Sequence, residues 1–366
     1  MPADRTSIIV VSWNHRRFLK DCVEAVERAG IPEGSARLII VDNASTDGTA
    51  DFIRRELIAE DGKTTKGGFP VLFLDNTDNL GFAGGNNQAM RIAMEDGDRY
   101  VYLLNPDTEA RNGFLREAVK VAERESDVGI VQSQLRLHPE TDRINSWGNA
   151  IHYLGFGYAG GESVLADSAE AKMKLRVREI AYASGAGMLI PTATLEAIGL
   201  LDEELFAYHE DLEFSWRAWL AGYRVLLAPD SVVHHKYEFS RSIRKYYWME
   251  RNRFIVMLRY YRPATMILLL PAGIAMELGL WLFAFRSGWW KEKLRAYAYF
   301  LLPSTWMKLA RARRRTQALR VVSDRETMKR FTGRVLFQQM SPALLTKVAN
   351  PLFALYWRIA HALMFW

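Results

Sequence analysis

The first half of the chain alternates short apolar runs with longer segments whose apolar residues recur at helical spacing. The β-branched run Ser7–Val11 predicts a strand, and the apolar positions that follow it to about Glu27 predict a helix. The pattern then repeats, with further strands predicted at 38–41, 71–74, 101–104 and 128–131. Alternation at this spacing predicts a mainly parallel sheet with helices on both faces, which is an α/β fold.

Polar residues follow several of these predicted strands. The first strand leads into Ser12-Trp-Asn14, the second into Asp42, and the third into the glycine-rich segment Asn79–Asn87. In open α/β sheets, ligands bind beyond the carboxyl ends of the strands. Paired glycines ahead of a helix let the backbone approach a phosphate closely, so we expect Asn79–Asn87 to precede a helix that runs to about Met94.

The predicted strand Val101–Leu104 ends in Asn105-Pro106-Asp107. Pro106 cannot continue a strand interior, so we expect the chain to turn there. That turn would place the Asn105 amide and the Asp107 carboxylate at the carboxyl edge of the sheet. Oxygen ligands of this kind suit Mg²⁺ or Mn²⁺ carrying a diphosphate. A plain turn without a metal is the competing interpretation.

A second pair of acids, Glu210 and Asp211, precedes an apolar stripe at helical spacing. The pair therefore lies at the predicted N-terminus of a helix that ends near Gly222, where the helix dipole favours an ionised carboxylate. The alternative is that the acids only cap the helix. The stripe consists of Leu212, Trp216, Trp219 and Leu220.

Two further regions bear on the site. Val225–Ala228 predicts another strand, and the tandem histidines His234 and His235 lie beyond it, where one of them is a candidate ligand. Residues 137–179 are rich in glycine and aromatic residues, and we expect long loops with short strands there, as in a lid on the acceptor side.

Composition and missing motifs exclude several classes. Neither a G-x-G-x-x-G after the first strand nor a P-loop occurs, and His209 does not begin an H-E-x-x-H, so dinucleotide binding, P-loop ATPase and zinc protease activities are disfavoured. The single cysteine, Cys22, fits a reducing compartment, and Met1–Ser7 has no secretory pattern. The net charge is +6, and arginines 311, 313, 314 and 315 lie beside apolar segments. We expect this cluster to contact anionic lipid, with a solvated face as the alternative, and we expect no nucleic acid partner.

The motifs, taken in order, resemble family 2 glycosyltransferases of the GT-A fold, and most closely their rhamnosyltransferase-type branch. The resemblance covers roughly residues 5–255. It is carried by Asp42–Asp47, Asn79–Asn86, Leu103–Asp107, Glu210 with Asp211, and His235 with Ser240 behind it.

The resemblance implies roles for these residues. Asp211 would be the general base of an inverting displacement, with Glu210 nearer the acceptor. Asn105 stands where the family has the first acid of D-x-D, so Asp107 is the charged ligand for a divalent cation, Mg or Mn, with His235 and Asn105 beside it. The expected donor-binding residues are Val11, Ser12, Asn14, Asp42, Asn79, Gly84, Asn86, Asn105 and Asp107.

The implied reaction moves a sugar from a nucleotide-diphosphate donor, dTDP-rhamnose or a UDP-sugar, to a lipid-linked or polysaccharide acceptor in cell-envelope glycan synthesis. A carboxylate base and a cation on the leaving diphosphate would suffice for it. The alternatives are a polyprenyl-phosphate glycosyltransferase and a non-catalytic sugar-nucleotide-binding scaffold, with an oxidoreductase as a third interpretation. The sequence specifies no oligomeric state.

The chain changes character near Pro263. We expect a transferase domain over 1–255 and a helical, membrane-associating region over 256–366. Residues 264–285 are apolar apart from Glu277 and are long enough to cross a bilayer. Because basic residues flank both ends, a hairpin at the interface, broken near Pro271 and Gly273, is the alternative to a span, and a buried helix is another. The predicted location is the cytoplasmic face of the cell membrane.

Overall fold

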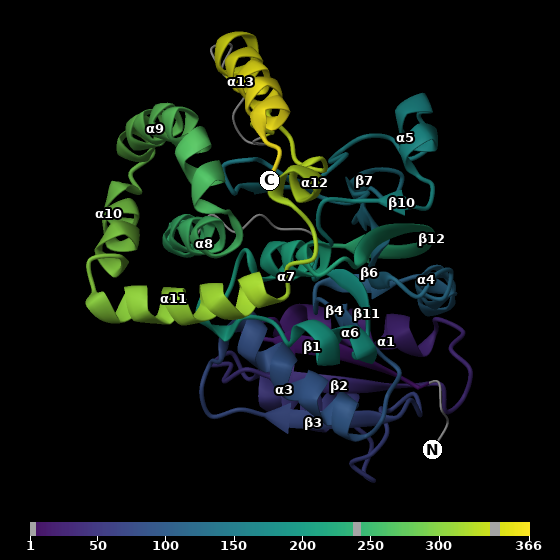
Figure 1. The fold of residues 1–366 in the computed structure, drawn as a ribbon. Coiled ribbons are helices and arrows are strands. Elements are labelled where there is room, and N and C mark those ends of the chain that lie inside the picture. Colours follow the sequence, from purple (N-terminus) through teal and green to yellow (C-terminus); the bar gives the residue numbers. More distant parts are fainter. Residues whose placement is uncertain (1–4, 237–242, 337–344) are drawn as a thin grey trace. The chain divides into compact units, whose positions relative to one another are not determined.

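The structure is a computed structural model that describes residues 5–236, 243–336 and 345–366. It divides into two compact units, shown in Figure 1. The sheet unit comprises Met1–Asn149, Ala159–Ala218 and Tyr223–Glu238. The helical unit comprises Ala150–Tyr158, Trp219–Gly222 and Phe239–Trp366.

The sheet unit is built on one large mixed sheet with the strand order β10-β12-β6-β11-β4-β1-β2-β3, while β5 pairs with β12 and β7 pairs with β6. The strands are β1 (Thr6–Ser12), β2 (Ala36–Asp42), β3 (Val71–Asp75), β4 (Tyr100–Leu104), β5 (Thr108–Ala110), β6 (Val128–Leu137), β7 (Ile144–Ser146), β10 (Arg178–Glu179), β11 (Gly187–Pro191) and β12 (Arg224–His235).

The long strands of this sheet run mostly in one direction. β1 pairs in parallel with β2 and β4, and β2 pairs in parallel with β3. β11 is antiparallel to both β4 and β6, so β6 and its parallel partner β12 point the same way as β4. The expected mainly parallel sheet is confirmed, with β11 as an antiparallel strand inside it.

Helices cover both faces of this sheet, as expected for an α/β fold. Alternate residues of β1 face opposite sides: Ile8 belongs to the core beneath α1 and α4, whereas Val11 faces α3. The helices of this unit are α1 (Arg16–Glu27), α2 (Thr49–Phe52), which continues as a π-helical turn (Ile53–Leu57), α3 (Gly81–Glu95), α4 (Phe114–Ala122), α5 (Ala169–Lys174), α6 (Thr192–Ile198), a 3₁₀ turn (Glu203–Leu205) and α7 (Glu210–Leu220), whose last residues belong to the helical unit.

β12 corrects one expectation about the histidines. His234 and His235 are the last two residues of this strand rather than residues beyond it. The strand continues past Pro229 because its register with β6 shifts between Ala228 and Val232. Such a bulge accommodates a residue that cannot join the hydrogen-bond ladder.

The helical unit gathers the C-terminal helices with a short earlier hairpin. The hairpin strands are β8 (Ala150–Ile151) and β9 (Gly157–Tyr158), which pair with each other. The sequence places a boundary near residue 255, whereas the compact units divide near Glu238. The helices are α8 (Lys245–Tyr260), α9 (Pro263–Arg286), α10 (Trp290–Tyr299), α11 (Pro303–Ala318), α12 (Asp324–Met328), a π-helical turn (Leu345–Ala349) and α13 (Asn350–Leu363).

α9 is one helix of 24 residues and contains Pro271 without a break. The alternative of a hairpin broken near Pro271 and Gly273 is therefore wrong. Proline costs the helix a backbone hydrogen bond, but the buried face continues through it, with Leu269 on one side and Ala272 and Met276 on the other. Among the described residues, α9 is the helix that is long and apolar enough to cross a membrane.

The arginine cluster of α11 divides into two kinds of side chain. Arg313 donates to the backbone carbonyls of Leu258 and Tyr261 at 2.6 and 2.7 Å, so it caps the C-terminal end of α8. Arg311, Arg314 and Arg315 are exposed. Three of the four arginines are therefore available to an anionic surface, and the fourth has a structural role.

Candidate active site at the carboxyl ends of the strands

The register of the first strands brings two of the predicted donor-binding residues level with each other. Ser12, at the end of β1, lies opposite Asp42, at the end of β2. Both side chains are buried, and Ser12 Oγ and Asp42 Oδ1 have no hydrogen-bond partner among the described residues. Buried polar atoms are normally satisfied, so two such oxygens side by side fit a site that receives the polar groups of a ligand.

The carboxylate of Asp42 is fixed by its own loop. Its second oxygen, Oδ2, accepts a hydrogen bond from the backbone N–H of Ser45 at 3.1 Å. Burial raises the pKa of Asp42, and the bonds to Ser45 counteract this only in part. The side chain is therefore held in place with one oxygen free to accept from a hydroxyl or a ring N–H.

Asn14 links the loops that follow β1 and β2. Its φ of 57° is left-handed, its backbone N–H donates to Ser45 Oγ at 2.8 Å, and its Oδ1 accepts from the backbone N–H of Thr46 at 2.7 Å. Asparagine tolerates this conformation better than most residues. The Asn14 side chain thus shapes the predicted donor loop through bonds within the protein.

Asn43 is a site residue that the sequence argument missed. Its Nδ2 donates to Asn79 Oδ1 at 3.1 Å and to the Gly81 carbonyl at 2.9 Å, while its Oδ1 accepts from the N–H of Leu80 at 3.1 Å. These bonds fasten the glycine-rich segment to the end of β2. Asn43 could have been recognised from the sequence, because it directly follows Asp42 in the motif Asp42–Asp47.

The glycines of that segment lie inside α3 rather than before it, which corrects the expectation of a phosphate loop ahead of the helix. α3 begins at Gly81. A Cβ on Gly85 would lie 2.8 Å from Val11 Cγ1, so glycine allows α3 to approach β1. Gly84 is buried in the same turn, and Asn86 donates to the Phe82 carbonyl at 2.8 Å. Here the paired glycines serve helix–strand packing.

Gly81 connects this segment to the turn ahead of the acid pair. Its φ is 73°, and a Cβ there would lie 2.5 Å from the carbonyl oxygen of Phe206. Phe206, Tyr208 and His209 all have left-handed φ angles, between 63° and 71°. Non-glycine residues in this region are strained, and such strain clusters at functional sites.

Asp107 and His235 are brought together by strand pairing. β5 pairs antiparallel with β12, so that His235 lies opposite Thr108, and the backbone N–H of Lys236 donates to the Asp107 carbonyl at 2.8 Å. As a result, His235 Nε2 lies 3.4 Å from Asp107 Oδ1. The family resemblance identified both residues as candidate ligands, but their positions in the sequence did not predict that they lie this close together.

The environment of this pair suits a cation. His235 Nδ1 lies 2.9 Å from Asn145 Oδ1, which orients the ring and turns Nε2 towards Asp107. Burial raises the pKa of Asp107, but the hydrogen bond and charge of His235 outweigh it, and the pKa stays below its usual value. An ionised carboxylate and an imidazole within 3.4 Å fit the donor set of a divalent ion. The described residues hold no group of three or more His, Cys, Asp or Glu side chains that could bind a metal ion.

A short segment before β11 connects the metal-type motif with the acid pair. The backbone N–H of Asn105 donates to the Ala186 carbonyl at 3.4 Å. One residue earlier, the backbone N–H of Gly185 donates to Asp211 Oδ2, also at 3.4 Å. Asn105 and Asp211 therefore share one stretch of backbone.

Glu210 and Asp211 begin α7, as expected. Burial raises the pKa of Asp211 to about 6, although hydrogen bonds from Leu212 and Gly185 favour its ionised form. Burial, and then the charge of Asp211, raise the pKa of Glu210 well above its usual value. Glu210 Oε2 is buried without a hydrogen-bond partner among the described residues. Two acids with separated pKa values suit acid–base chemistry better than simple helix capping.

His234 points to the opposite face of β12 and lies across from Arg136 and Glu109 rather than Asp107. Burial and the charges of Arg111 and Arg136 lower its pKa to about 4. We therefore assign His234 no role in the candidate cation site. Ser240, quoted with His235, lies outside the described residues.

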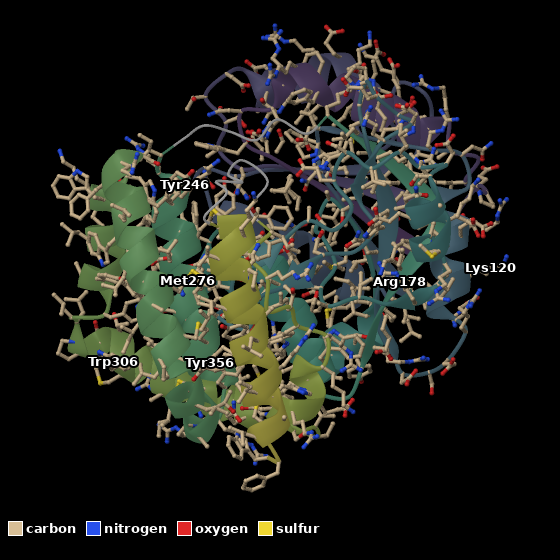
Figure 2. All side chains as sticks on the ribbon, turned by 90° about the horizontal axis from the view of Figure 1, so that it is seen from above. Lys120, Arg178, Tyr246, Met276, Trp306 and Tyr356 are labelled. Atoms are coloured by element: carbon tan, nitrogen blue, oxygen red, sulfur yellow. The ribbon has the colours of Figure 1, made fainter. Side chains whose placement is uncertain are left out.

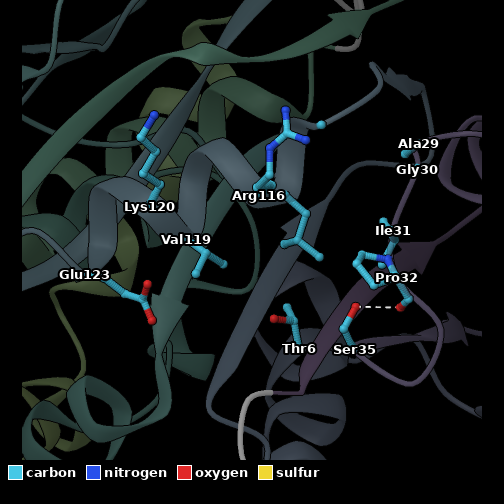
Figure 3. A pocket seen from close by; sticks show the side chains of 12 residues that line it. Thr6, Ala29, Gly30, Ile31, Pro32, Ser35, Arg116, Val119, Lys120 and Glu123 are labelled. Atoms are coloured by element: carbon cyan, nitrogen blue, oxygen red, sulfur yellow. Dashed lines mark hydrogen bonds between the residues drawn. The ribbon is translucent and has the colours of Figure 1, made fainter.

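Figure 3 shows a pocket at the amino ends of the strands. It is lined by Thr6, where β1 begins, and by residues of α4 such as Arg116 and Lys120. It therefore lies at the amino ends of the strands, away from the polar residues described above.

Comparison with known proteins identifies the family of the chain. A sequence profile of the glycosyltransferase-like family 2 matches residues 2–255. The low-salt glycan biosynthesis hexosyltransferase Agl10 of Haloferax volcanii is 25% identical over 222 residues, which cover 59% of this chain and 62% of that protein. The N-acetylglucosaminyl-diphospho-decaprenol L-rhamnosyltransferase of Mycobacterium tuberculosis is 24% identical over 237 residues, 60% of this chain and 71% of that protein.

Among solved structures, GalNAc-T7 with UDP, GalNAc and Mn²⁺ superposes with a TM-score of 0.53 at 15% identity, covering 71% of this chain and 48% of that one. This likeness concerns the fold, and it confirms the expected GT-A architecture. The profile match covers more than half of the chain. The chain belongs to the glycosyltransferase-like family 2.

Proposed function

We propose that this chain is an inverting glycosyltransferase that moves a sugar from a nucleotide-diphosphate donor to an acceptor hydroxyl, with Asp211 as the general base. The observation that carries the proposal is the backbone shared by Asn105 and Asp211 through Ala186 and Gly185. It holds a base next to the motif that would bind the donor diphosphate. No residue in this arrangement needs to form a covalent intermediate.

In the proposed reaction, Asp211 accepts the proton of the acceptor hydroxyl as its oxygen bonds to the anomeric carbon of the donor sugar. The bond from that carbon to the diphosphate breaks on the opposite side, so the configuration inverts and a nucleoside diphosphate leaves. A pKa of about 6 suits the role, because Asp211 is then ionised at neutral pH yet basic enough to share the proton. Glu210, whose pKa is raised by burial and by the charge of Asp211, would lie nearer the acceptor.

We also propose that Asp107 and His235, with Asn105 beside them, hold a divalent cation, Mg or Mn. The ion would stabilise the negative charge on the departing diphosphate. The ligand geometry supports this, and GalNAc-T7, which shares the fold, was solved with Mn²⁺. Val11, Ser12, Asn14 and Asp42 would bind the nucleoside. Asn79, Gly84 and Asn86 would support that site, because Asn79 and Asn86 form hydrogen bonds within the protein and Gly84 packs closely against Leu80.

The proposed donor is dTDP-rhamnose or a UDP-sugar, and the proposed acceptor is a lipid-linked or polysaccharide glycan of the cell envelope. The names of the two curated relatives support these assignments, because one is a hexosyltransferase of glycan biosynthesis and the other an L-rhamnosyltransferase with a diphospho-decaprenol substrate. A lipid-linked acceptor would require the enzyme at the cytoplasmic face of the membrane. The apolar surface of the helical unit is consistent with that location.

The test is a donor screen on the purified full-length chain. Thermal shift and donor hydrolysis are measured across dTDP-, UDP- and GDP-sugars, and transfer is then measured to a polyprenyl-diphosphate-linked sugar and to polyprenyl phosphate. Transfer to the linked sugar supports the proposal, and transfer to polyprenyl phosphate supports the alternative of a polyprenyl-phosphate glycosyltransferase. Donor binding without turnover on any acceptor would favour a sugar-nucleotide-binding scaffold.

A further inference from the structure

One face of α9 is a continuous apolar stripe that is exposed along the whole helix. Its side chains recur every three or four residues and are between 54% and 72% exposed. An exposed apolar patch of this extent marks a contact with a membrane or a partner. The stripe consists of Ile267, Leu270, Ile274, Leu278, Leu282 and Phe285.

The neighbouring helix α13 adds a second stripe, whose side chains are between 53% and 62% exposed. Tyr356 of α13 donates a hydrogen bond to the Leu268 carbonyl of α9. Both helices belong to the helical unit. Figure 2 labels one residue of each, Met276 of α9 and Tyr356 of α13. The second stripe consists of Leu352, Leu355, Ile359 and Leu363.

The opposite face of α9 is bound to polar partners of its own unit. Near its start, Thr265 donates to Asp324 Oδ2 of α12 at 2.5 Å. Near its middle, Glu277 accepts from Lys293 of α10 at 2.7 Å and forms an ion pair with Arg253 of α8. The Lys293 side chain is 0% exposed and that of Arg253 is 3% exposed.

This charge cluster is fully paired. Glu250 of α8 lies 3.0 Å from Arg253 and also bonds Lys293, so that two acids meet two cations. Burial raises the pKa of Glu277, but the charges of Arg253 and Lys293 outweigh it and keep the pKa low. The only acid of α9 is thus tied to α8 and α10, and this fixes which face of α9 points outwards.

These contacts decide how α9 can meet a bilayer. At 24 residues the helix is about 36 Å long, and Glu277 lies near its middle. If α9 crossed the membrane, the cluster of Arg253 and Lys293 would lie near the midplane, and α10 would bring its exposed Lys291 and Arg295 into the hydrocarbon. Charged side chains facing lipid at that depth are rare and costly.

We infer that α9 lies in the plane of an anionic bilayer, with its stripe in the boundary between headgroups and acyl chains and both of its ends on the same side. The inference rests on the proposed membrane attachment. Exposed Arg262 and Arg286 at the two ends of α9, and Lys291 after it, supply the charge complementary to lipid phosphates. Glu277 is the residue that sets the rotation of the helix.

Cysteine labelling tests the orientation. The wild-type chain is the blank, because its single cysteine, Cys22, is buried. Ala264→Cys and Ser287→Cys each place one thiol at an exposed end of α9. Each full-length variant is added to preformed phosphatidylglycerol/phosphatidylcholine vesicles and treated with a membrane-impermeant maleimide, before and after detergent.

Equal labelling of both ends without detergent is expected. Protection of one end until detergent is added would show that α9 spans the bilayer, which overturns the inference while leaving membrane attachment intact. A wild-type chain that does not float with the vesicles would instead contradict the attachment itself. The two failures are therefore distinguishable.

A second experiment tests the surface. The double variant Ile274→Asn and Leu278→Asn should lower the vesicle partition coefficient at least about tenfold, with little change in melting temperature, because both side chains point outwards. Leu165→Asn, at an exposed leucine of the sheet unit, is the matched control and should not change partition. If the double variant binds vesicles normally but converts a lipid-free dimer into a monomer, the stripe is an interface between two copies and the inference fails.

Discussion

His235 Nε2 lies 3.4 Å from Asp107 Oδ1 because the antiparallel pairing of β5 with β12 sets His235 opposite Thr108. The two residues are separated by half of the sheet unit in sequence, and yet they form one ligand pair. Removing either side chain should therefore weaken the proposed cation site to a similar degree.

We expect Asp107→Ala and His235→Ala each to weaken the binding of the nucleotide-sugar donor, and EDTA to weaken it in the wild type. The physical reason is that the donor diphosphate loses the cation that bridges it to the protein. Isothermal titration with and without Mn²⁺ measures this. Donor affinity that is unchanged by EDTA would contradict the metal assignment.

Two variants serve as contrasts for that experiment. His234→Ala changes the adjacent residue, which faces Arg136 on the other side of β12, and it should leave the metal dependence intact. Asp42→Ala should weaken binding of the free nucleoside with or without metal, because its unpaired oxygen lies in the proposed nucleoside site.

Asp211→Asn should keep donor affinity while lowering kcat by at least about a hundredfold, because the amide cannot accept the acceptor proton. Steady-state kinetics on the best donor and acceptor, with donor affinity measured separately, gives the result. Near-normal kcat in this variant would move the role of base to Glu210 or elsewhere.

The pH dependence of kcat follows from the same carboxylate. Burial raises the pKa of Asp211 to about 6, and the base acts only when ionised. Activity should thus be full at pH 7 to 8 and fall as the pH drops through about 6, approaching a tenfold loss for each further pH unit. A profile that stays flat down to pH 5 would exclude Asp211 as the base.

Glu210→Gln should change the pH dependence of stability. Burial and the charge of Asp211 raise the pKa of Glu210 in the folded state. The folded state therefore loses stability relative to the unfolded state as the pH rises above the pKa that Glu210 has in the unfolded chain. Glutamine has no such cost. The melting temperature of the variant relative to wild type should increase between pH 5 and pH 8, and a constant difference would refute this account.

Gly85→Ala should destabilise the fold by about 1–3 kcal/mol, because its Cβ would lie 2.8 Å from Val11 Cγ1. The control is Gly279→Ala in α9, where no atom lies within 4 Å of the new Cβ. There the substitution should be neutral or stabilising by up to about 1 kcal/mol, since alanine is the better helix former. Chemical denaturation measures both. Equal effects would mean that α3 shifts freely on β1.

The sequence predicted those features that depend on local pattern. Short apolar runs locate β1 to β4, and the apolar stripe with Gly222 locates α7, because burial repeats with the period of each element. Asp107 and Asp211 were identifiable because each follows a recognisable strand end or helix start. α9 was visible as an apolar run with a single acid.

Features that depend on long-range pairing were not predictable. β11 lies antiparallel between β4 and β6, and nothing in Gly187–Pro191 itself specifies that position. Asn145 orients His235 only because β7 pairs with the end of β6. The packing role of Gly85 likewise depends on Val11, a residue of another element.

Tyr153 contacts two aromatic residues of the C-terminal part of the chain. Its ring stacks on Trp357 with centroids 5.1 Å apart, and its carbonyl accepts from the Tyr261 hydroxyl, 108 residues later. On the ribosome, residues 150–158 therefore emerge long before their partners in α8 and α13. A nascent or truncated chain ending before α13 would expose this aromatic hairpin to chaperones or to aggregation, so this part of the fold is complete only after α13 has been synthesised.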